Sequence, residues 1–371
     1  MKHILFISHA RGVHGAEAVM VQAAKTCAAH GARVMLVVPS IVPEAGLEEA
    51  VKGINGLQII ALPYRAGGIN ALRTKLVQLY NIPTLLRLKR FVKREQVEAI
   101  YSNTTLTILG AALAKATGVR HVWHWHEPID ERFGWHSTLK ELYREWAQQA
   151  DAIVCISRQQ QKEWEQALDV QLKNAHVIYN PMKRIIPMKS DKHASRRGAR
   201  IGFIGHFEKR KNIELLIRVF EDLHEQDPET SLLLCGAIDE KGRQYVENLT
   251  DLRPPVVTIL PQTPDVAKFY NNIDILVLPS WRETMPLVVL EAMQAGVCVL
   301  QTNRSGMSEL IEDGKESIFF SPDDAETLLM QLTQCLDAAY RQQIAKAGQE
   351  KALQLVNNLS FDKQIQDLLC K

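Results

Sequence analysis

The chain alternates short apolar runs with longer stretches in which apolar residues recur at helical spacing. Each run has five or six residues and is nearly continuously apolar, which is typical of strands buried on both faces of a sheet. Amphipathic segments such as residues 16–31 and 212–226 lie between the runs. Such alternation predicts parallel sheets with helices on both faces. The strand-like runs are residues 3–8, 33–38, 57–62, 97–102, 120–125, 152–157, 176–180, 200–205, 231–236, 256–261, 274–279 and 297–301.

The alternation breaks once, at residues 181–199. This stretch holds two prolines, many charges and no clean period, which indicates a linker between domains. We therefore expect an α/β protein of two Rossmann-like doubly wound domains, residues 1–180 and residues 200–354. Two such lobes facing each other would form a cleft at the carboxyl ends of their strands.

Length and composition agree with this division into two domains and limit the kinds of partner that the protein can have. The 371 residues exceed one ordinary domain and fit two. A net charge of +2 gives no general attraction to nucleic acid. The six cysteines form no CxxC pair, the N-terminus does not resemble a signal peptide, and no run reaches the roughly 18 apolar residues of a membrane span. We therefore expect a cytoplasmic protein with reduced thiols.

The first strand-to-helix turn contains Gly12 and Gly15. These glycines let the backbone approach a ligand, and the helix that opens at Ala16 offers free N–H groups to an anion. The turn lacks the G-x-G-x-x-G pattern, and the chain has no P-loop. These absences argue against a nicotinamide dinucleotide and a P-loop ATPase. A glycine turn with a purely structural role is the alternative to an anion site.

Two histidines, His124 and His126, end the run of residues 120–125. Because they are two residues apart, their side chains face the same side of a strand. Together with Glu127 they suggest a metal, but no third His or Cys follows at a usual zinc spacing. Two other interpretations stay open: a histidine that caps the strand end, and a polar residue of the cleft.

The second domain opens with a basic turn, in which Lys209, Arg210 and Lys211 precede Asn212, a candidate N-cap. Cations are unfavourable beside a helix N-terminus, whose dipole is positive there. An anion such as a diphosphate above the turn would explain them. A solvated charged loop is the alternative.

The segment WRETMPLVVLEAMQAG carries two glutamates, Glu283 in the loop after a strand and Glu291 about one turn into a helix. Pro286 suits the first helical position, which leaves the N–H groups of Leu287 and Val288 for an anion. Two acids on either side of an anion site would repel a bare phosphate, but they could accept hydrogen bonds from a ribose and a sugar. This arrangement predicts a nucleoside diphosphate sugar.

The whole chain resembles the retaining glycosyltransferases of GT-B fold in family 4, also called group 1. The resemblance is strongest over residues 271–314, which include a glutamate-x7-glutamate element. It implies an enzyme that transfers a hexose-type sugar with retained configuration and uses no cofactor besides the donor. We expect activity without a metal, because protein cations and helix ends are available for the phosphate charge and the chain has no Asp-x-Asp pair of the kind that holds a metal and a diphosphate. Segments similar to weaker family motifs are residues 14–17, 123–128, 150–157, 177–181 and 205–212.

The resemblance also implies roles for single residues. Glu283 would bind hydroxyls of the transferred sugar, and Glu291 would bind the ribose. His126 would lie at the reaction centre and Gly15 near the phosphates. Residues 355–371 would cross back to the first domain. The diphosphate would be held by Arg210 and Lys211 together with the backbone of Thr284, Met285, Pro286 and Leu287.

Three positions depart from the family pattern. His206 stands where arginine is frequent, so diphosphate binding would depend on Arg210. His14 stands where a second glycine is common, which alters the expected path of the first turn. Pro181 replaces a frequent glycine.

Residues 65–94 bear on the acceptor, since they contain eight basic residues, no acid and interleaved leucines. A basic amphipathic helix suits an anionic membrane surface or a lipid diphosphate, and a helix with a solvated basic face is the alternative. We expect a glycan or polyprenyl-linked acceptor at the inner face of the plasma membrane, as in bacterial surface polysaccharide assembly.

Two rival functions fit the same sequence. A GT-B-fold epimerase would use the same cleft for a nucleotide sugar and would alter the donor without an acceptor. A non-catalytic two-lobed binding protein would need neither the basic turn nor the paired glutamates.

Overall fold

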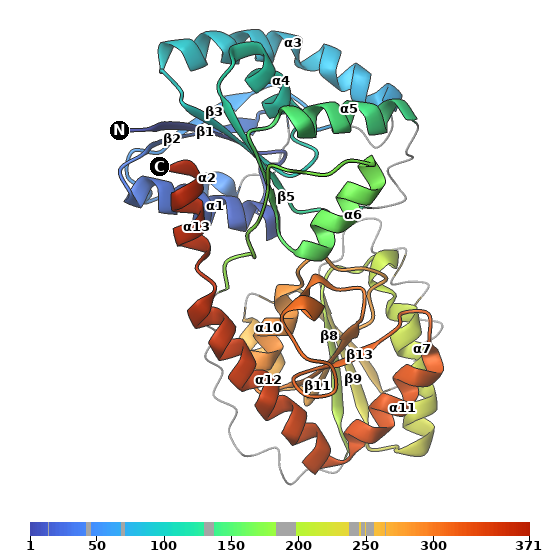
Figure 1. The fold of residues 1–371 in the computed structure, drawn as a ribbon. Coiled ribbons are helices and arrows are strands. Elements are labelled where there is room, and N and C mark those ends of the chain that lie inside the picture. The colour runs from blue at the N-terminus through green and yellow to red at the C-terminus, as the bar shows by residue number, and fades with distance from the viewer. Residues whose placement is uncertain are drawn as a thin grey trace. The chain divides into compact units, whose positions relative to one another are not determined.

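A computed structural model describes residues 1–13, 15–41, 46–67, 71–129, 137–182, 198–236, 245, 249, 256–263 and 265–371. His14 and most of the expected linker, residues 181–199, lie outside the described residues. The chain divides into two compact units (Figure 1). One contains Met1–Pro181 and Ser360–Lys371, and the other contains Met182–Leu359. Each unit is built on one parallel sheet, so the predicted pair of Rossmann-like sheets is confirmed.

The sheet of the first unit has the order β3-β2-β1-β4-β5-β6-β7, and all its strands run parallel. The winding direction reverses between β1 and β4, which is where open α/β sheets bind ligands. The strands are β1 (His3–Ile7), β2 (Arg33–Pro39), β3 (Gln58–Leu62), β4 (Ala99–Asn103), β5 (Arg120–Trp125), β6 (Ala152–Cys155) and β7 (Ala175–Val177).

Helices cover both faces of this sheet because successive strand residues point to opposite sides. In β1, Ile4 and Phe6 pack in the core beneath α1 and α13, whereas Leu5 and Ile7 pack beneath α3 and α4 (Figure 1). The helices of the first unit are α1 (Gly15–Ala29), α2 (Leu47–Ala50), α3 (Ala71–Arg94), α4 (Ile108–Thr117), α5 (Ser137–Gln149), α6 (Arg158–Leu168) and α13 (Phe361–Leu369).

The last helix, α13, belongs to the first unit although it ends the chain. Thr26 Oγ1 donates to Asp362 Oδ1 at 2.5 Å, and Arg120 Nη1 donates to the Leu368 carbonyl at 2.6 Å. Phe361 and Ile365 are buried in the core beside α1. The preceding helix continues to Asn358, so the chain enters the first unit at Ser360 rather than at residue 355.

The sheet of the second unit repeats the same winding, with the order β10-β9-β8-β11-β12-β13 and its reversal between β8 and β11. The strands are β8 (Arg200–Ile204), β9 (Ser231–Gly236), β10 (Val257–Pro261), β11 (Ile275–Leu278), β12 (Cys298–Thr302) and β13 (Ile318–Phe320). The short edge strand β13 was not predicted, because its three residues are too few to form a recognisable run.

The helical segments of the second unit are η2 (Lys209–Lys211), α7 (Ile213–Gln226), α9 (Val266–Asn271), α10 (Leu287–Gln294), η3 (Gly306–Glu309), α11 (Ala325–Leu336) and α12 (Ala338–Asn358). Across the described residues of both units, no helix combines the length and apolar character that a membrane span requires.

Candidate active site

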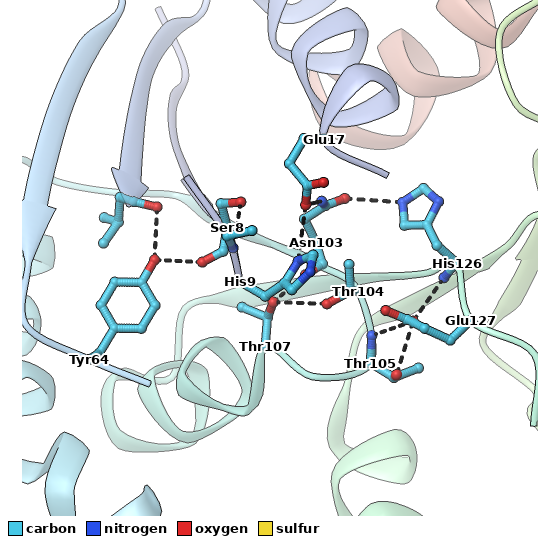
Figure 2. A network of polar contacts seen from close by, with 12 residues as sticks. Ser8, His9, Glu17, Tyr64, Asn103, Thr104, Thr105, Thr107, His126 and Glu127 are labelled. Carbon is cyan, nitrogen blue, oxygen red and sulfur yellow. Dashed lines mark hydrogen bonds and ion pairs between the residues drawn. The ribbon is translucent and has the colours of Figure 1, made fainter. Parts of the chain in front are cut away.

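Polar side chains of the first unit gather at the carboxyl ends of β1, β4 and β5, around the point where the winding reverses (Figure 2). His9 follows β1, Asn103 ends β4, and His126 follows β5. Glu17 reaches the same place from the first turn of α1. One end of the sheet therefore brings together residues from four separate elements.

His9 and Glu17 form an ion pair, with His9 Nδ1 3.0 Å from Glu17 Oε1. Burial opposes charge on both groups, but the hydrogen bond and the attraction between the two side chains outweigh burial. The pKa of His9 is raised and the pKa of Glu17 is lowered as a result. The site thus holds a buried carboxylate that favours the protonated form of the neighbouring imidazole.

Asn103 connects this pair to His126. Its amide nitrogen donates to Glu17 Oε1 at 3.4 Å, and its amide oxygen lies 3.0 Å from His126 Nε2 (Figure 2). Because the amide oxygen can only accept, His126 must carry its proton on Nε2. Burial lowers the pKa of His126 to about 4, since it outweighs the attraction of Glu127 and Glu17. His126 is therefore neutral near pH 7, with a defined tautomer.

Glu127 ties the end of β5 to the loop after β4. Its Oε2 accepts hydrogen bonds from the Thr105 backbone N–H and from Thr105 Oγ1, both at 2.9 Å (Figure 2). This carboxylate is used in positioning the loop. Among the described residues, no three His, Cys, Asp or Glu side chains are grouped as metal ligands.

His124 has a different environment from His126, although their ring centroids lie only 4.0 Å apart. His124 is fully buried, and its Nδ1 is hydrogen-bonded to the hydroxyl of Tyr101. Burial, followed by the neighbouring His126, holds the pKa of His124 well below its ordinary value. His124 is thus a core residue, and His126 is the histidine that takes part in the polar network.

Gly15 is the first residue of α1. A Cβ atom built there would meet nothing within 4 Å, so the space above this helix start is open. The predicted anion site at this turn also contains Glu17 in the first helical turn. A carboxylate at that position favours the helix dipole but opposes a second negative charge.

In the second unit, Glu283 forms ion pairs with both predicted cations. Lys211 Nζ lies 2.7 Å from Glu283 Oε1, and Arg210 Nη1 lies 3.5 Å from Oε2. Glu283 is only 8% exposed. Burial alone would raise its pKa, but Lys211 and Arg210 outweigh burial and lower the pKa of Glu283. Arg210 also contacts Glu208 Oε1 at 2.7 Å, so four charges balance within one cluster.

Backbone hydrogen bonds hold this cluster together. The Trp281 N–H donates to the Arg210 carbonyl at 3.0 Å, which joins the turn after β8 to the loop after β11. The Glu283 N–H donates to the Arg304 carbonyl at 2.9 Å, and the Gly306 N–H donates to the Glu283 carbonyl at 3.0 Å. Glu283 is therefore fixed to the loops after three strands at the winding reversal of the second sheet.

Two expected helix starts differ from the structure. Asn212 occupies the N-cap position of α7 but does not cap it, since its Nδ2 donates to the Pro322 carbonyl at 3.0 Å instead. Pro286 is the N-cap of α10 rather than its first helical residue, because its ψ of 101° lies outside the helical region. Leu287 and Val288 are then the first two helical residues, and the Val289 N–H donates to the Pro286 carbonyl at 3.1 Å.

The remaining predicted donor residues surround this helix start. Met285 is buried and Thr284 is half-buried between Glu283 and Pro286. Glu291 lies within α10 and accepts a hydrogen bond from the Tyr270 hydroxyl at 2.8 Å. Burial, and then Glu291, raises the pKa of Tyr270, so the phenol keeps its proton and orients the carboxylate.

Comparison with known proteins identifies the family. Residues 13–183 match the family model described as glycosyltransferase family 4, and residues 187–351 match the model described as glycosyl transferases group 1. The chain is a group 1 glycosyltransferase. Its two sheets agree with this assignment, because solved proteins of the GT-B fold superpose on the whole chain.

Three curated relatives illustrate the similarity of this glycosyltransferase to others. An uncharacterized glycosyltransferase of Haemophilus influenzae is 25% identical over 255 residues, which cover 66% of this chain and 68% of that protein. The D-inositol 3-phosphate glycosyltransferase of Salinispora tropica is 27% identical over 47% of this chain and 38% of its own length. The capsular polysaccharide biosynthesis glycosyltransferase CapM of Staphylococcus aureus is 26% identical over 41% and 40%. The matched region is thus well under two thirds of the last two relatives.

Solved structures show the fold of this glycosyltransferase more completely. Anabaena HepE in complex with UDP superposes with a TM-score of 0.82 at 20% identity and covers 100% of both chains. A glycosyltransferase from Rickettsia africae superposes with a TM-score of 0.77 at 15% identity and covers 99% of this chain and 97% of its own.

Several residues of these networks were not predicted from the sequence, among them His9, Glu17, Asn103 and Tyr270. Glu17 lies inside the segment of residues 14–17 that carried part of the family resemblance, and Asn103 directly follows a strand-like run. Polar residues at such strand ends are the available signal. Their partners are distant in sequence, as in the pair of Asn103 and Glu17, and no local pattern indicates them.

Proposed function

We propose that this glycosyltransferase moves a hexose-type sugar from a nucleoside diphosphate sugar to a glycan or lipid-linked glycan, with retention of configuration and without a metal. The observation that carries the proposal is the buried Glu283 with Lys211 and Arg210, next to the start of α10. A carboxylate, two cations and a helix N-terminus match the hydroxyls and the diphosphate of such a donor. The presence of UDP and UDP-glucose in the HepE structures supports a UDP sugar as the first donor to test.

The donor would bind to the same side chains that form the ion pairs described above. Its diphosphate would meet Arg210, Lys211 and the N–H groups of Leu287 and Val288, while Glu283 would accept hydrogen bonds from the sugar. Glu291, oriented by Tyr270, would accept them from the ribose. As the bond to the sugar breaks, negative charge grows on the leaving phosphate, and the prepositioned cations would stabilise it.

Retention would follow from a front-face route guided by the leaving phosphate. Retaining hydrolases instead use two carboxylates about 5 Å apart, one of them a nucleophile. Glu283 is paired with two cations, which lowers its pKa and its nucleophilicity together. The neutral His126 would hold a reacting hydroxyl by a hydrogen bond at the reaction centre.

The acceptor would be a lipid-linked glycan at the inner face of the plasma membrane, with the protein peripheral there. The similarity to a capsular polysaccharide glycosyltransferase favours a role in surface polysaccharide assembly. The basic residues of the segment 65–94 favour an anionic surface.

The deciding experiment incubates the protein with UDP-glucose, with and without a polyprenyl-linked acceptor, and follows UDP release and the anomeric configuration by NMR. We expect acceptor-dependent UDP release, an α-linked product and full activity in EDTA. Epimerised donor in the absence of acceptor would instead establish an isomerase. Activity lost in EDTA and restored by magnesium or manganese would refute metal independence.

A further inference from the structure

Helix α3 (Ala71–Arg94) carries an unusual share of the exposed apolar surface. Twelve large hydrophobic residues are exposed in the described part of the chain, and six of them lie on this one helix. Leu72 is 71% exposed and Leu79 is 62% exposed. The others are Leu76, Tyr80, Ile82 and Leu86. An apolar patch concentrated on one helix indicates an interaction surface.

The apolar residues lie on the side of α3 opposite to the sheet. Leu72, Leu79 and Leu86 are spaced by seven residues, which is close to two helical turns, so they form one line along the helix. The inward side includes the polar residues Asn81 and Thr84, both nearly fully buried. These polar groups lie beside Val77, Leu88 and Val92, which are buried in the core. The helix is therefore apolar on its outer side as well as its inner side, whereas an ordinary amphipathic helix has a polar outer face.

The buried polar groups anchor the helix in this orientation. The Asn81 amide donates to the Arg65 carbonyl and accepts from the Arg65 N–H, both at 2.9 Å. Thr84 Oγ1 donates to the Pro63 carbonyl at 2.5 Å. Because these contacts fix the inward side, the leucines cannot turn inward by rotation of the helix.

The basic residues of α3 are concentrated in its second half. The helix contains seven Lys or Arg residues and no acid. Within the described part of the chain, four exposed bases of the second half have no carboxylate partner: Arg87, Lys89, Arg90 and Lys93. An outward face that carries a line of leucines together with unpaired bases matches a surface with hydrocarbon beneath a layer of negative charge.

We infer that α3 lies on an anionic phospholipid bilayer, with its leucine line at the acyl boundary and its basic half over the lipid phosphates. Protein interfaces are depleted in lysine and acidic residues, whereas this helix exposes lysines and arginines and contains no acid. The inference deepens the proposed function, on which it rests for the lipid-linked nature of the acceptor, and it identifies the element that would bring the first unit to that acceptor.

A groove between α3 and α4 extends the apolar surface. It has a volume of about 400 Å³, and Leu79, Ile82, Ile108 and Leu109 line it together with Lys75. Leu79 and Ile82 belong to both the groove and the exposed face. The groove would let one lipid chain of the bilayer pass between the helices toward the start of α4, shortly after Asn103 at the candidate active site.

The test is sedimentation of the full chain with vesicles of phosphatidylcholine alone or with about 30% phosphatidylglycerol, at low and physiological salt. One variant replaces the leucine line (Leu72→Ser, Leu79→Ser, Leu86→Ser), and another reverses charge (Arg87→Glu, Lys89→Glu, Arg90→Glu). Matched controls alter exposed residues elsewhere: Met330→Ser with Leu353→Ser, and Lys25→Glu with Lys346→Glu and Lys363→Glu. Melting curves check that every variant is folded.

We expect the wild type to bind the anionic vesicles only, and each α3 variant to bind at least about tenfold more weakly, since each basic contact contributes roughly fivefold. The controls should bind like the wild type. Failure of the wild type to bind anionic vesicles at low salt would overturn the inference, as would a leucine variant that binds normally. A wild-type dimer that the leucine variant converts to a monomer, without vesicle binding, would show that the face is a protein interface.

Calorimetry with UDP on the same variants separates this inference from the proposed function. UDP binding should survive in every α3 variant, because the donor residues lie in the other unit. Vesicle binding without any UDP binding would refute a UDP sugar as the donor and leave the membrane surface standing. UDP binding without vesicle binding would refute the membrane surface alone.

Discussion

The two units place different chemistry at the same point of the same sheet topology. In each sheet the winding reverses between the first and fourth strands of the unit, and polar residues gather at that point. In the second unit the cluster is ionic: Glu283 contacts Lys211 and Arg210. In the first unit, the ion pair of His9 and Glu17 leads through Asn103 to the neutral His126.

This contrast shows what one topology leaves open. The reversal supplies a location, and the residues on the adjoining turns supply the chemistry. Two prepositioned cations suit a ligand that brings several negative charges. A neutral imidazole with a defined tautomer suits hydroxyl groups, which need direction more than charge.

The largest effect is expected from the centre of the ionic cluster. Glu283→Gln should lower kcat by about 100-fold or more, the size of effect seen when one electrostatic contact to a transition state is lost. Because Lys211 and Arg210 would lose a charged partner, the free energy of unfolding should also fall by about 1–3 kcal/mol. Steady-state kinetics and chemical denaturation measure the two effects.

The matched control is Glu208→Gln, which touches only Arg210 of the two cations and is more exposed. It should change kcat by less than about threefold, since exposed ion pairs contribute little. Equal decreases of kcat from the two substitutions would mean that Glu283 has no larger role in catalysis than Glu208.

Glu291→Gln tests whether the second unit uses separate glutamates for the sugar and for the nucleotide. We expect it to raise the KM for the donor and to weaken binding of the bare nucleoside diphosphate by about 1–3 kcal/mol, because a hydrogen bond to a charged group is lost. Titration calorimetry with UDP measures the change. Tyr270→Phe should act in the same direction but less. If Glu283→Gln weakens UDP binding as much as Glu291→Gln does, the proposed division of roles fails.

Asn103→Asp tests whether the first unit needs a neutral imidazole. A carboxylate 3.0 Å from His126 Nε2 would raise the pKa of His126 from about 4 toward neutrality. The kcat should therefore fall by about tenfold at pH 6 and recover toward pH 8, as the added proton leaves. Asn358→Asp, on an exposed face of α12, is the control and should leave the pH profile unchanged. An unaltered profile in Asn103→Asp would remove His126 from the mechanism.

The smallest effect concerns the ion pair of His9 and Glu17. The folded pKa of His9 lies above its ordinary 6.5, so its contribution to stability is complete below pH 6.5 and is lost as pH rises through the raised value. The folded pKa of Glu17 lies below its ordinary 4.5, so its contribution is present above pH 4.5 and is lost as pH falls through the lowered value. The pair should therefore stabilise the fold most between about pH 4.5 and 6.5.

Urea unfolding of the wild type and Glu17→Gln at several pH values measures this window. The difference in unfolding free energy should be about 1 kcal/mol near pH 5.5 and smaller near pH 9. His9→Gln should remove most of the pH dependence of that difference. A difference that grows toward pH 9 would show that Glu17 is stabilised by something other than His9.

Much of the fold follows from local sequence pattern. All twelve predicted strands exist, because each combines a continuous apolar run with a following turn. The edge strand β13 lacked such a run. The helix start at Pro286 was misplaced by one residue, since a proline is compatible with both positions and only ψ distinguishes them.

Less of the candidate site could be predicted from local sequence pattern. Arg210, Lys211 and Glu283 could be placed on turns after strands, but their direct contact joins residues 72 and 73 positions apart. Asn212 shows the same limit, because the Pro322 carbonyl that takes its side chain is 110 positions away. Contacts of this range depend on how strands are ordered in a sheet, which local patterns do not specify.

The position of α13 has a consequence for the synthesis of the protein. Phe361 and Ile365 fill part of the core beneath α1, so the first unit lacks a piece of its interior until residues 360–371 leave the ribosome. Domains usually fold in the order in which they are made, but here the first to be translated is the last to be completed. The core that α13 completes, which includes Val21 and Ala24, would remain partly open while the second unit is translated, and removal of residues 360–371 would leave it open permanently.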